Sequence, residues 1–200
     1  MTQMNSTARQ AWIAIRLIIV GAILLGVVYP LAITGIGKLV ASDKANGSLV
    51  QTNGVVIGSA LIGQNFTADK WFQPRPSAAG ASGYDALASG GSNLGPNNTD
   101  LLADVKDRRT AIEQQNGVAL TVPPDALTAS GSGLDPDISP EYARLQIPRV
   151  ARTNGLSESV VADVVAANTV GRQLGFVGET RVNVLLLNIA IARISKRTSP

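Results

Sequence analysis

The residues from Leu17 to Gly37 read LIIVGAILLGVVYPLAITGIG and carry no charge. Together with the apolar residues around Ile13 and Ile15, they are long enough to cross the roughly 30 Å hydrocarbon core of a bilayer at about 1.5 Å per residue. The rest of the chain is more polar and has the composition of a globular domain. The sequence therefore predicts a tail over residues 1–12, a transmembrane helix over residues 13–37 and a globular domain over residues 38–200.

A cleaved secretory signal is the alternative to a membrane anchor. Such signals have an apolar stretch of about 7–15 residues, followed by a cleavage site between small residues that Ala41 and Ser42 could imitate. The apolar stretch of this chain exceeds that length. Its length therefore favours an anchor over a signal.

The basic residues near the apolar stretch do not decide its orientation by themselves. Two precede the stretch, Arg9 and Arg16, and two follow it, Lys38 and Lys44. Cytoplasmic flanks carry the excess of positive charge, and the free N-terminal amine adds one positive charge to the short tail. We therefore expect a cytoplasmic N-terminus, a helix in contact with membrane lipid, and an exported domain after Lys38.

The charges of the chain are balanced outside the apolar helix. The formal net charge is +3, and Arg9, Arg16 and Lys38 account for it, so residues 39–200 are neutral. A nucleic-acid-binding domain needs an excess of basic residues that displaces counterions, so we expect no nucleic-acid partner. The chain has no cysteine and no histidine, which excludes disulfides, an imidazole base and an ordinary zinc site. No motif supports a calcium or magnesium site, and we expect neither catalytic residues nor a metal site.

The domain is expected to be α+β, with long loops, because Gly, Ser, Asn and Pro are abundant in it. The short apolar runs from Val55 to Phe66 predict strands with tight turns, and residues 71–98 predict a long loop. Two further strands are predicted, over Val118 to Val122 before a pair of prolines and over Leu127 to Ala129.

Four helices are predicted from cap residues and from apolar residues at helical spacing. Asn98 or Thr99 caps the first helix, which ends at Gly117. The second begins at Ser139 and Pro140, and Pro148 should kink or restart it because proline has no N–H to donate. The other two are a helix capped by Ser157 and a last apolar helix from Val182 to Ile194.

Two clusters of glycine and serine, Ser89–Gly95 and Ser130–Pro136, are candidates for a binding site. Glycine-rich loops before helices cradle phosphates, because backbone N–H groups converge there. Neither cluster continues into the Gly-Lys-Ser/Thr of a nucleotide-hydrolysing loop, so structural turns are the favoured interpretation. Asp135 and Asp137 could form an acid-base pair, but a turn with Asp before proline explains them better.

Seven strings of the sequence occur in the order and spacing of one known family. They are NGSL (46–49), GSALIGQNF (58–66), RPSA (75–78), YDALASGGSNLGP (84–96), TASGSGLDPDISP (128–140), PRVA (148–151) and GRQLGFVGETRVNVLLLN (171–188). On these strings the chain resembles the C subunit of the Kdp-type potassium-transporting P-type ATPase. The resemblance runs from Tyr29 nearly to the C-terminus.

The resemblance implies a place in a bacterial inner-membrane complex that takes up potassium with high affinity at the expense of ATP. In that family one subunit selects the ion and another hydrolyses ATP, while the C subunit supports assembly and raises the ATP affinity of the catalytic subunit. The expected partners are therefore the ion-selecting and ATP-hydrolysing subunits. The C subunit itself is not an enzyme, which agrees with a chain that has neither histidine nor cysteine.

The resemblance also implies a nucleotide contact, with ATP shared with the catalytic subunit. On this chain we expect Gln146, in RLQIPR (144–149), to make it, because a glutamine amide can pair with the N6/N7 edge of adenine. A surface or capping glutamine is the alternative. The phosphate contacts would come from Ser130, Gly131, Ser132 and Gly133. Relatives often carry histidine where this chain has Asp137, so any role of that imidazole is missing here.

The expected orientation conflicts with a direct ATP contact, because an exported domain meets little ATP. We therefore favour a structural or gating role on the external face, over the ion entry path, above nucleotide binding. The alternative from another class is a self-standing, membrane-anchored protein that binds a small extracellular ligand or a component of the cell envelope.

Overall fold

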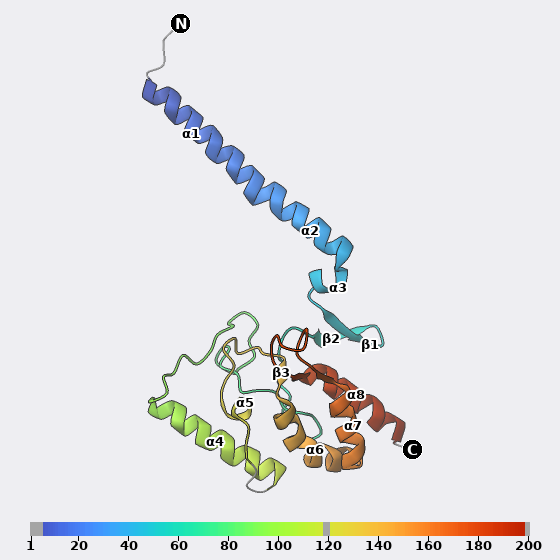
Figure 1. Cartoon of the computed structure of the whole chain (residues 1–200). Helices are drawn as coiled ribbons and strands as arrows, with labels where there is room; N and C mark the ends of the chain where they lie inside the picture. Colours follow the sequence, from blue (N-terminus) through green and yellow to red (C-terminus); the bar gives the residue numbers. More distant parts are fainter. Residues whose placement is uncertain (1–5, 118–120, 199–200) are drawn as a thin grey trace. The chain divides into compact units, whose positions relative to one another are not determined.

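The computed structural model describes residues 6–117 and 121–198 of the chain (Figure 1). The contacts within the chain divide it into two compact units, Met1–Leu49 and Val50–Pro200. Residues 38–49, which the sequence assigned to the globular domain, thus group with the N-terminal helix.

The N-terminal unit is dominated by one continuous helix over Ser6–Val40. It consists of α1 (Ser6–Ile23), the π-helical segment η1 (Leu24–Val28) and α2 (Tyr29–Val40). By length and composition this helix can cross a membrane, and its apolar residues are not buried within the chain. The predicted apolar helix over residues 13–37 lies within it, and the helix also includes residues 6–12, which the sequence assigned to the tail, and residues 38–40. A short helix, α3 (Ser42–Ala45), follows it.

The segment η1 is a wide turn that lies immediately before Pro30. The N–H of Tyr29 donates to the carbonyl of Leu24, five residues earlier, instead of four as in an α-helix. Pro30 has no N–H, and in a regular α-helix its ring would press against the carbonyl of Gly26. The wide turn accommodates the proline without ending the helix.

The second unit begins with a β-hairpin. Strand β1 (Leu49–Thr52), which the sequence did not predict, pairs with β2 (Val55–Ser59) in a two-stranded sheet. Asn53 and Gly54 connect them with φ angles of 52° and 77°, as the tightest hairpin turns require. The prediction of β structure from Val55 to Phe66 is confirmed only for β2, since residues 60–66 are irregular.

The middle of the chain contains the long loop and two helices. Helix α4 (Thr99–Asn116) begins as predicted, because the side chain of Asn98 accepts hydrogen bonds from the N–H groups of Asp100 and Leu101 at 2.7 and 3.2 Å. It ends at Gly117, which has a φ of 77°. Residues 71–98 form no regular element, as predicted.

The two strands predicted after α4 are not found among the described residues. Of the second one, Leu127 is the last residue of helix α5 (Pro124–Leu127), and Thr128 and Ala129 are irregular. Pro124 in the first turn favours this helix, because a missing N–H costs nothing there. Of the strand predicted over Val118 to Val122, residues 118–120 lie outside the described residues, and the last two residues are irregular.

Helix α6 (Pro140–Asn154) starts at the predicted residue, with the Oγ atom of Ser139 accepting from the N–H of Tyr142 at 3.0 Å. It continues through Pro148 without restarting, because only the carbonyl of the exposed Arg144 loses its partner and water can replace it. Helix α7 (Glu158–Ala167) is capped by Ser157 as predicted.

A small antiparallel sheet completes the unit, with strands in the order β3-β5-β4. They are β3 (Asp137–Ile138), β4 (Thr169–Val170) and β5 (Arg181–Asn183). Helix α8 (Val184–Thr198) follows β5 directly. The predicted last helix is therefore confirmed, except that its first two residues belong to a strand.

The core of the second unit lies where α6 packs against α7 and α4, with α8 against α7. It is lined by buried apolar residues from the long loop, the helices α4 to α8 and the strands β3 and β5, among them Phe72, Ile112, Tyr142, Val150, Val161, Val182, Leu187 and Ile191. Burial raises the pKa of the Tyr142 hydroxyl to about 12. The prediction of one apolar helix followed by an α+β domain is confirmed.

Candidate functional site

Gln146, the residue predicted to contact adenine, lies in the interior of α6 with no exposed surface. Its Oε1 atom accepts hydrogen bonds from the backbone N–H of Gln73 and from the Arg149 guanidinium, both at 2.7 Å. Its Nε2 atom donates to the carbonyl of Gln73 at 3.1 Å. The amide is thus occupied by the protein's own groups, and an adenine contact would require the chain around Gln73 to move.

Arg149, one turn further along α6, is 1% exposed. Its guanidinium donates to Asn116 Oδ1 at 2.9 Å, to the carbonyl of Trp71 at 3.0 Å and to the carbonyl of Asp69. None of the ion pairs among the described residues includes it. Burial lowers the pKa of Arg149, and the nearby Asp69 carboxylate opposes that shift. The cation is therefore held mainly by carbonyl and amide oxygens.

Asn188 on α8 also binds the loop that contains Gln73. Its Oδ1 atom accepts from the N–H of Phe72 at 2.8 Å, and its Nδ2 atom donates to the carbonyl of Phe72 at 2.9 Å. Two consecutive residues of an irregular loop are thereby paired with side-chain amides as they would be with a neighbouring strand. We call Gln146, Arg149 and Asn188, with the loop residues Phe72 and Gln73, the amide clasp.

The sequence did not predict the amide clasp, although one signal points to it. Gln146 falls at helical spacing between Ala143 and Val150, which with Ile147 form the buried stripe of α6. A polar residue within an apolar stripe is buried, and a buried amide needs partners. Its partners cannot be read from the sequence, because they lie in an irregular loop more than seventy residues earlier.

The predicted phosphate loop, Ser130–Gly133, packs against the other Gly/Ser cluster. The carbonyl of Ser132 accepts from the N–H of Gly90 at 2.8 Å and from Ser89 Oγ at 2.9 Å. Gly133 has a φ of 66°, and a Cβ atom added to it would lie 2.6 Å from the carbonyl oxygen of Gly90. Glycine is therefore required at position 133, because a residue with a Cβ atom does not fit where the two backbones approach this closely.

The loop is bound to its neighbours at both ends. The N–H of Ser130, a buried residue, donates to the carbonyl of Pro76 at 3.3 Å, and the carbonyl of Gly133 accepts from Ser77 Oγ at 2.5 Å. Gly131 and Ser132 are exposed. The loop leads into strand β3 and not directly into a helix. The structure therefore joins the two Gly/Ser clusters to each other. The side chain of Gln146 makes its hydrogen bonds with Gln73 and Arg149 and with neither cluster.

An acidic cleft of about 450 Å³ lies beside this loop, lined mostly by charged residues and prolines. Asp135 pairs with Arg75 at 2.8 Å, and Asp137 pairs with Arg181 at 2.8 Å. Burial raises the pKa of the Asp137 carboxyl above its usual range, while Arg181 opposes that shift. The two aspartates are thus engaged with separate arginines, and the described geometry does not join them as an acid-base pair.

Comparisons with known proteins agree with one another. The model of the family described as "K+-transporting ATPase, c chain" matches residues 11–193. The chain is 54% identical to the "Potassium-transporting ATPase KdpC subunit" of Kineococcus radiotolerans over 189 residues, which cover 94% of this chain and 95% of the relative. It is 52% identical to the subunit of the same name from Mycobacterium tuberculosis, over 93% of this chain and 99% of the relative. A match of this extent leaves one conclusion: the chain belongs to the family of the c chain of the K+-transporting ATPase.

Proposed function

We propose that this chain is a non-catalytic accessory subunit of a high-affinity, ATP-driven potassium-uptake complex, in which it supports assembly and raises the ATP affinity of the catalytic subunit. The observation that carries the proposal is the family match over residues 11–193, together with relatives named as subunits of a potassium-transporting ATPase. The sequence has neither histidine nor cysteine, two common catalytic residues, which supports a non-catalytic role.

The proposed location is the inner membrane of a bacterium. The apolar helix over Ser6–Val40 is long enough to be the anchor. The short tail then lies in the cytoplasm and the second unit, Val50–Pro200, lies outside it. The ion-selecting and ATP-hydrolysing subunits are the proposed neighbours of the helix and of the external domain.

The effect on ATP affinity is proposed to pass through a partner subunit. The hydrogen bonds of the Gln146 amide support this indirect route, because they occupy the Oε1 acceptor twice and one of the two Nε2 N–H groups, so the donor–acceptor pair that a base would need is already in use. Direct contact of ATP with Gln146 and the loop Ser130–Gly133 is the competing proposal. The exposure of Gly131 and Ser132 favours it, since a ligand in solvent can reach these two residues.

Purification from mild detergent tests the proposed function. A tagged full-length chain should bring down much larger membrane subunits with ATPase activity, and cells lacking the chain should fail to grow at very low potassium. Growth at high potassium is the control and should be unchanged. A chain that purifies alone, from cells whose mutant grows normally at low potassium, contradicts the proposal and favours a self-standing anchored binding protein.

A further inference from the structure

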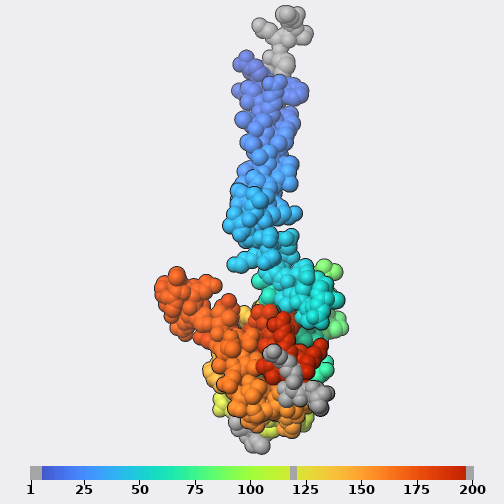
Figure 2. Space-filling model, turned by 90° about the vertical axis from the view of Figure 1, so that its right-hand side faces the viewer, coloured from blue at the N-terminus to red at the C-terminus, as the bar shows by residue number. Residues whose placement is uncertain are grey.

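The hairpin between β4 and β5 projects from the body of the second unit. All residues from 171 to 180 are exposed, and Figure 2 shows this segment in orange as an arm that stands clear of the packed helices. Val182 at its base is fully buried, which fixes the arm to the core. We call residues 171–180 the finger.

The finger keeps a defined shape by backbone hydrogen bonds. The N–H of Gln173 donates to the carbonyl of Val177 and the N–H of Val177 donates to the carbonyl of Gln173, both at 2.9 Å. Leu174 and Gly175 form the turn with φ angles of 52° and 81°. A leucine in this left-handed conformation is unusual. The turn therefore places a bulky side chain where glycine or asparagine is commoner.

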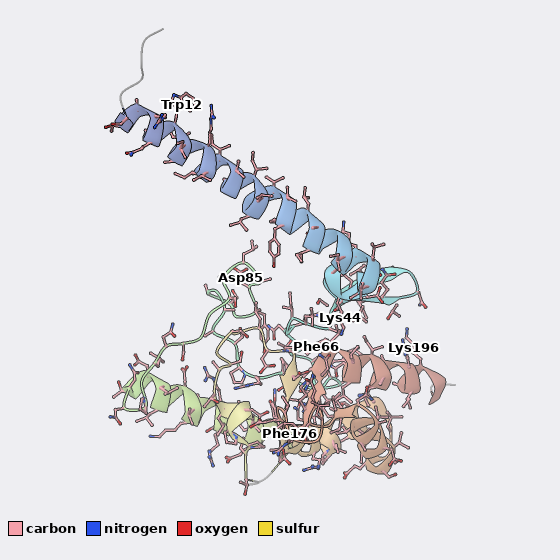
Figure 3. The ribbon with its side chains drawn as sticks, turned by 45° about the horizontal axis from the view of Figure 1, so that its top comes forward. Trp12, Lys44, Phe66, Asp85, Phe176 and Lys196 are labelled. Atoms are coloured by element: carbon pink, nitrogen blue, oxygen red, sulfur yellow. The ribbon has the colours of Figure 1, made fainter. Side chains whose placement is uncertain are left out.

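The side chains at the tip are large, apolar and exposed. Leu174 is 85% exposed and Phe176 is 75% exposed, and Phe176 is labelled in Figure 3. The fold gains nothing from these two side chains, because they bury little surface within the chain. Phenylalanine is enriched in the buried core of protein interfaces, and an aromatic and an aliphatic anchor on a preformed turn suit insertion into a partner's pocket.

We propose that the finger inserts Leu174 and Phe176 into an apolar pocket of another subunit of the potassium-transporting ATPase. This inference rests on the proposed function. The pocket would be lined by aliphatic or aromatic side chains, with charged groups of both signs at its rim. The rim would pair with Arg172 and Glu179, which flank the tip and form no ion pair with any other described residue.

The charges of the finger favour a protein over a lipid surface as the occupant. A loop that seats on anionic lipid carries an excess of Lys and Arg. Here Arg172 and Glu179 offset each other, and Arg181 at the base is already paired with Asp137 at 2.8 Å. A protein rim can match charges of both signs, whereas an anionic headgroup layer repels the glutamate.

Variants of the full-length chain test the finger. Leu174→Asn removes the apolar anchor and retains a residue that accepts the left-handed conformation, while Phe176→Gln removes the ring. Each should weaken rebinding of the purified chain to a complex prepared without it by roughly tenfold or more. The matched control is Leu102→Gln on α4, where the leucine is 52% exposed, and it should change the dissociation constant by less than about twofold.

Photo-crosslinking identifies the occupant. A photoreactive residue in place of Phe176 should form an adduct with another subunit of the pump, and one in place of Leu102 should not form the same adduct. Adducts only with lipid, adducts only with a second copy of the chain, or variants that rebind as tightly as the wild type would each overturn the inference. A wild-type chain that has no larger partners at all would instead overturn the proposed function.

Discussion

At the scale of the residue, the amide clasp shows how an irregular loop is held without a strand. Gln146 and Asn188 each offer a donor and an acceptor side by side, which is what a peptide group offers to a neighbouring strand. Both are buried, at 0% and 3% exposure. Their hydrogen bonds to Gln73 and Phe72 satisfy backbone groups that the loop could not satisfy by itself.

Gln146→Ala should destabilise the second unit by about 3 kcal/mol. The substitution leaves the partly buried N–H and carbonyl of Gln73 and one N–H of the buried Arg149 without their partner. Urea unfolding of the full chain in mild detergent, followed by tryptophan fluorescence, measures the loss. Gln146→Glu is the comparison: it retains the acceptor for the Gln73 N–H and adds a negative charge beside the Arg149 guanidinium. That pairing offsets the repulsion between its second oxygen and the carbonyl of Gln73, so it should lose less stability.

The same variant separates the two proposals for ATP. If Gln146 only supports the loop, Gln146→Ala and Gln146→Glu should change the apparent ATP affinity of the assembled complex in proportion to their loss of stability. A complex that is fully assembled and stable with Gln146→Ala, yet binds ATP much more weakly, would contradict the indirect route and support direct contact. An unchanged free energy of unfolding in Gln146→Ala would show that the amide clasp contributes little to the stability of the second unit.

At the scale of the element, the two Gly/Ser loops form one structural unit by direct backbone contact. The carbonyl of Ser132 accepts hydrogen bonds from Ser89 and Gly90, and a Cβ atom added to Gly133 would lie 2.6 Å from the carbonyl oxygen of Gly90. Contacts this close exclude a side chain at the facing position. The glycines of the cluster therefore differ in whether they tolerate a side chain, and this difference cannot be read from the sequence.

Gly133→Ala should cost about 2–4 kcal/mol of the free energy of unfolding, because it combines a left-handed φ with a collision against backbone. Gly131→Ala is the matched control in the same loop. A Cβ atom there meets nothing within 4 Å and no positive φ opposes it, so the change should be less than about 0.5 kcal/mol. Equal urea midpoints for the two variants would contradict the packing of the loops.

The elements that the sequence predicted correctly depend on local signals. Asn98, Ser139 and Ser157 each accept the hydrogen bond expected of a helix cap, because capping is decided within three residues. Strands as short as β3, with two residues, are decided by their partners across the sheet instead. The strand predicted over Leu127 to Ala129 was wrong for the same reason, since its residues have no strand beside them.

For the candidate site, the resemblance selected Gln146 and the loop Ser130–Gly133, but the residues alone could not show what these groups contact. The burial of Gln146 follows from its place in the apolar stripe of α6. Its pairing with Gln73 spans a sequence separation of 73 residues, and no local pattern carries that information. The finger was missed because Leu174 and Phe176 lie in a segment of mixed polar and apolar residues, in which only the fold shows which side chains are exposed.

At the scale of the whole molecule, the chain separates a helix with a long uncharged apolar stretch from a polar unit with its own core. The net charge of +3 arises from residues at or before Lys38, and the second unit is balanced. These two units suit different surroundings, hydrocarbon for the first and water for the second. The two proposals for ATP differ in the side of the membrane that they require for the second unit, because an exported domain meets little ATP.

Because the chain contains no cysteine, a single engineered thiol reports the side of the membrane. Ala103→Cys on α4 places it on an exposed position of the second unit, and Ala8→Cys places it on an exposed position near the start of α1. In intact cells, a membrane-impermeant maleimide should label Ala103→Cys and spare Ala8→Cys. Permeabilised cells are the control and should show both labelled. The reverse pattern in intact cells would contradict the proposed orientation.

The wide turn at Leu24–Val28 has a consequence for any helix that lies along the anchor. One additional residue in a turn displaces the angular phase of everything beyond it by about 100°. A seam of contacts that follows every third and fourth position through Ser6–Ile23 therefore continues, after Tyr29, on positions displaced by one in the sequence. A helical wheel for α2 must therefore be drawn separately, starting at Tyr29. A neighbouring helix that packs along both α1 and α2 would contact residues in two different registers of the sequence.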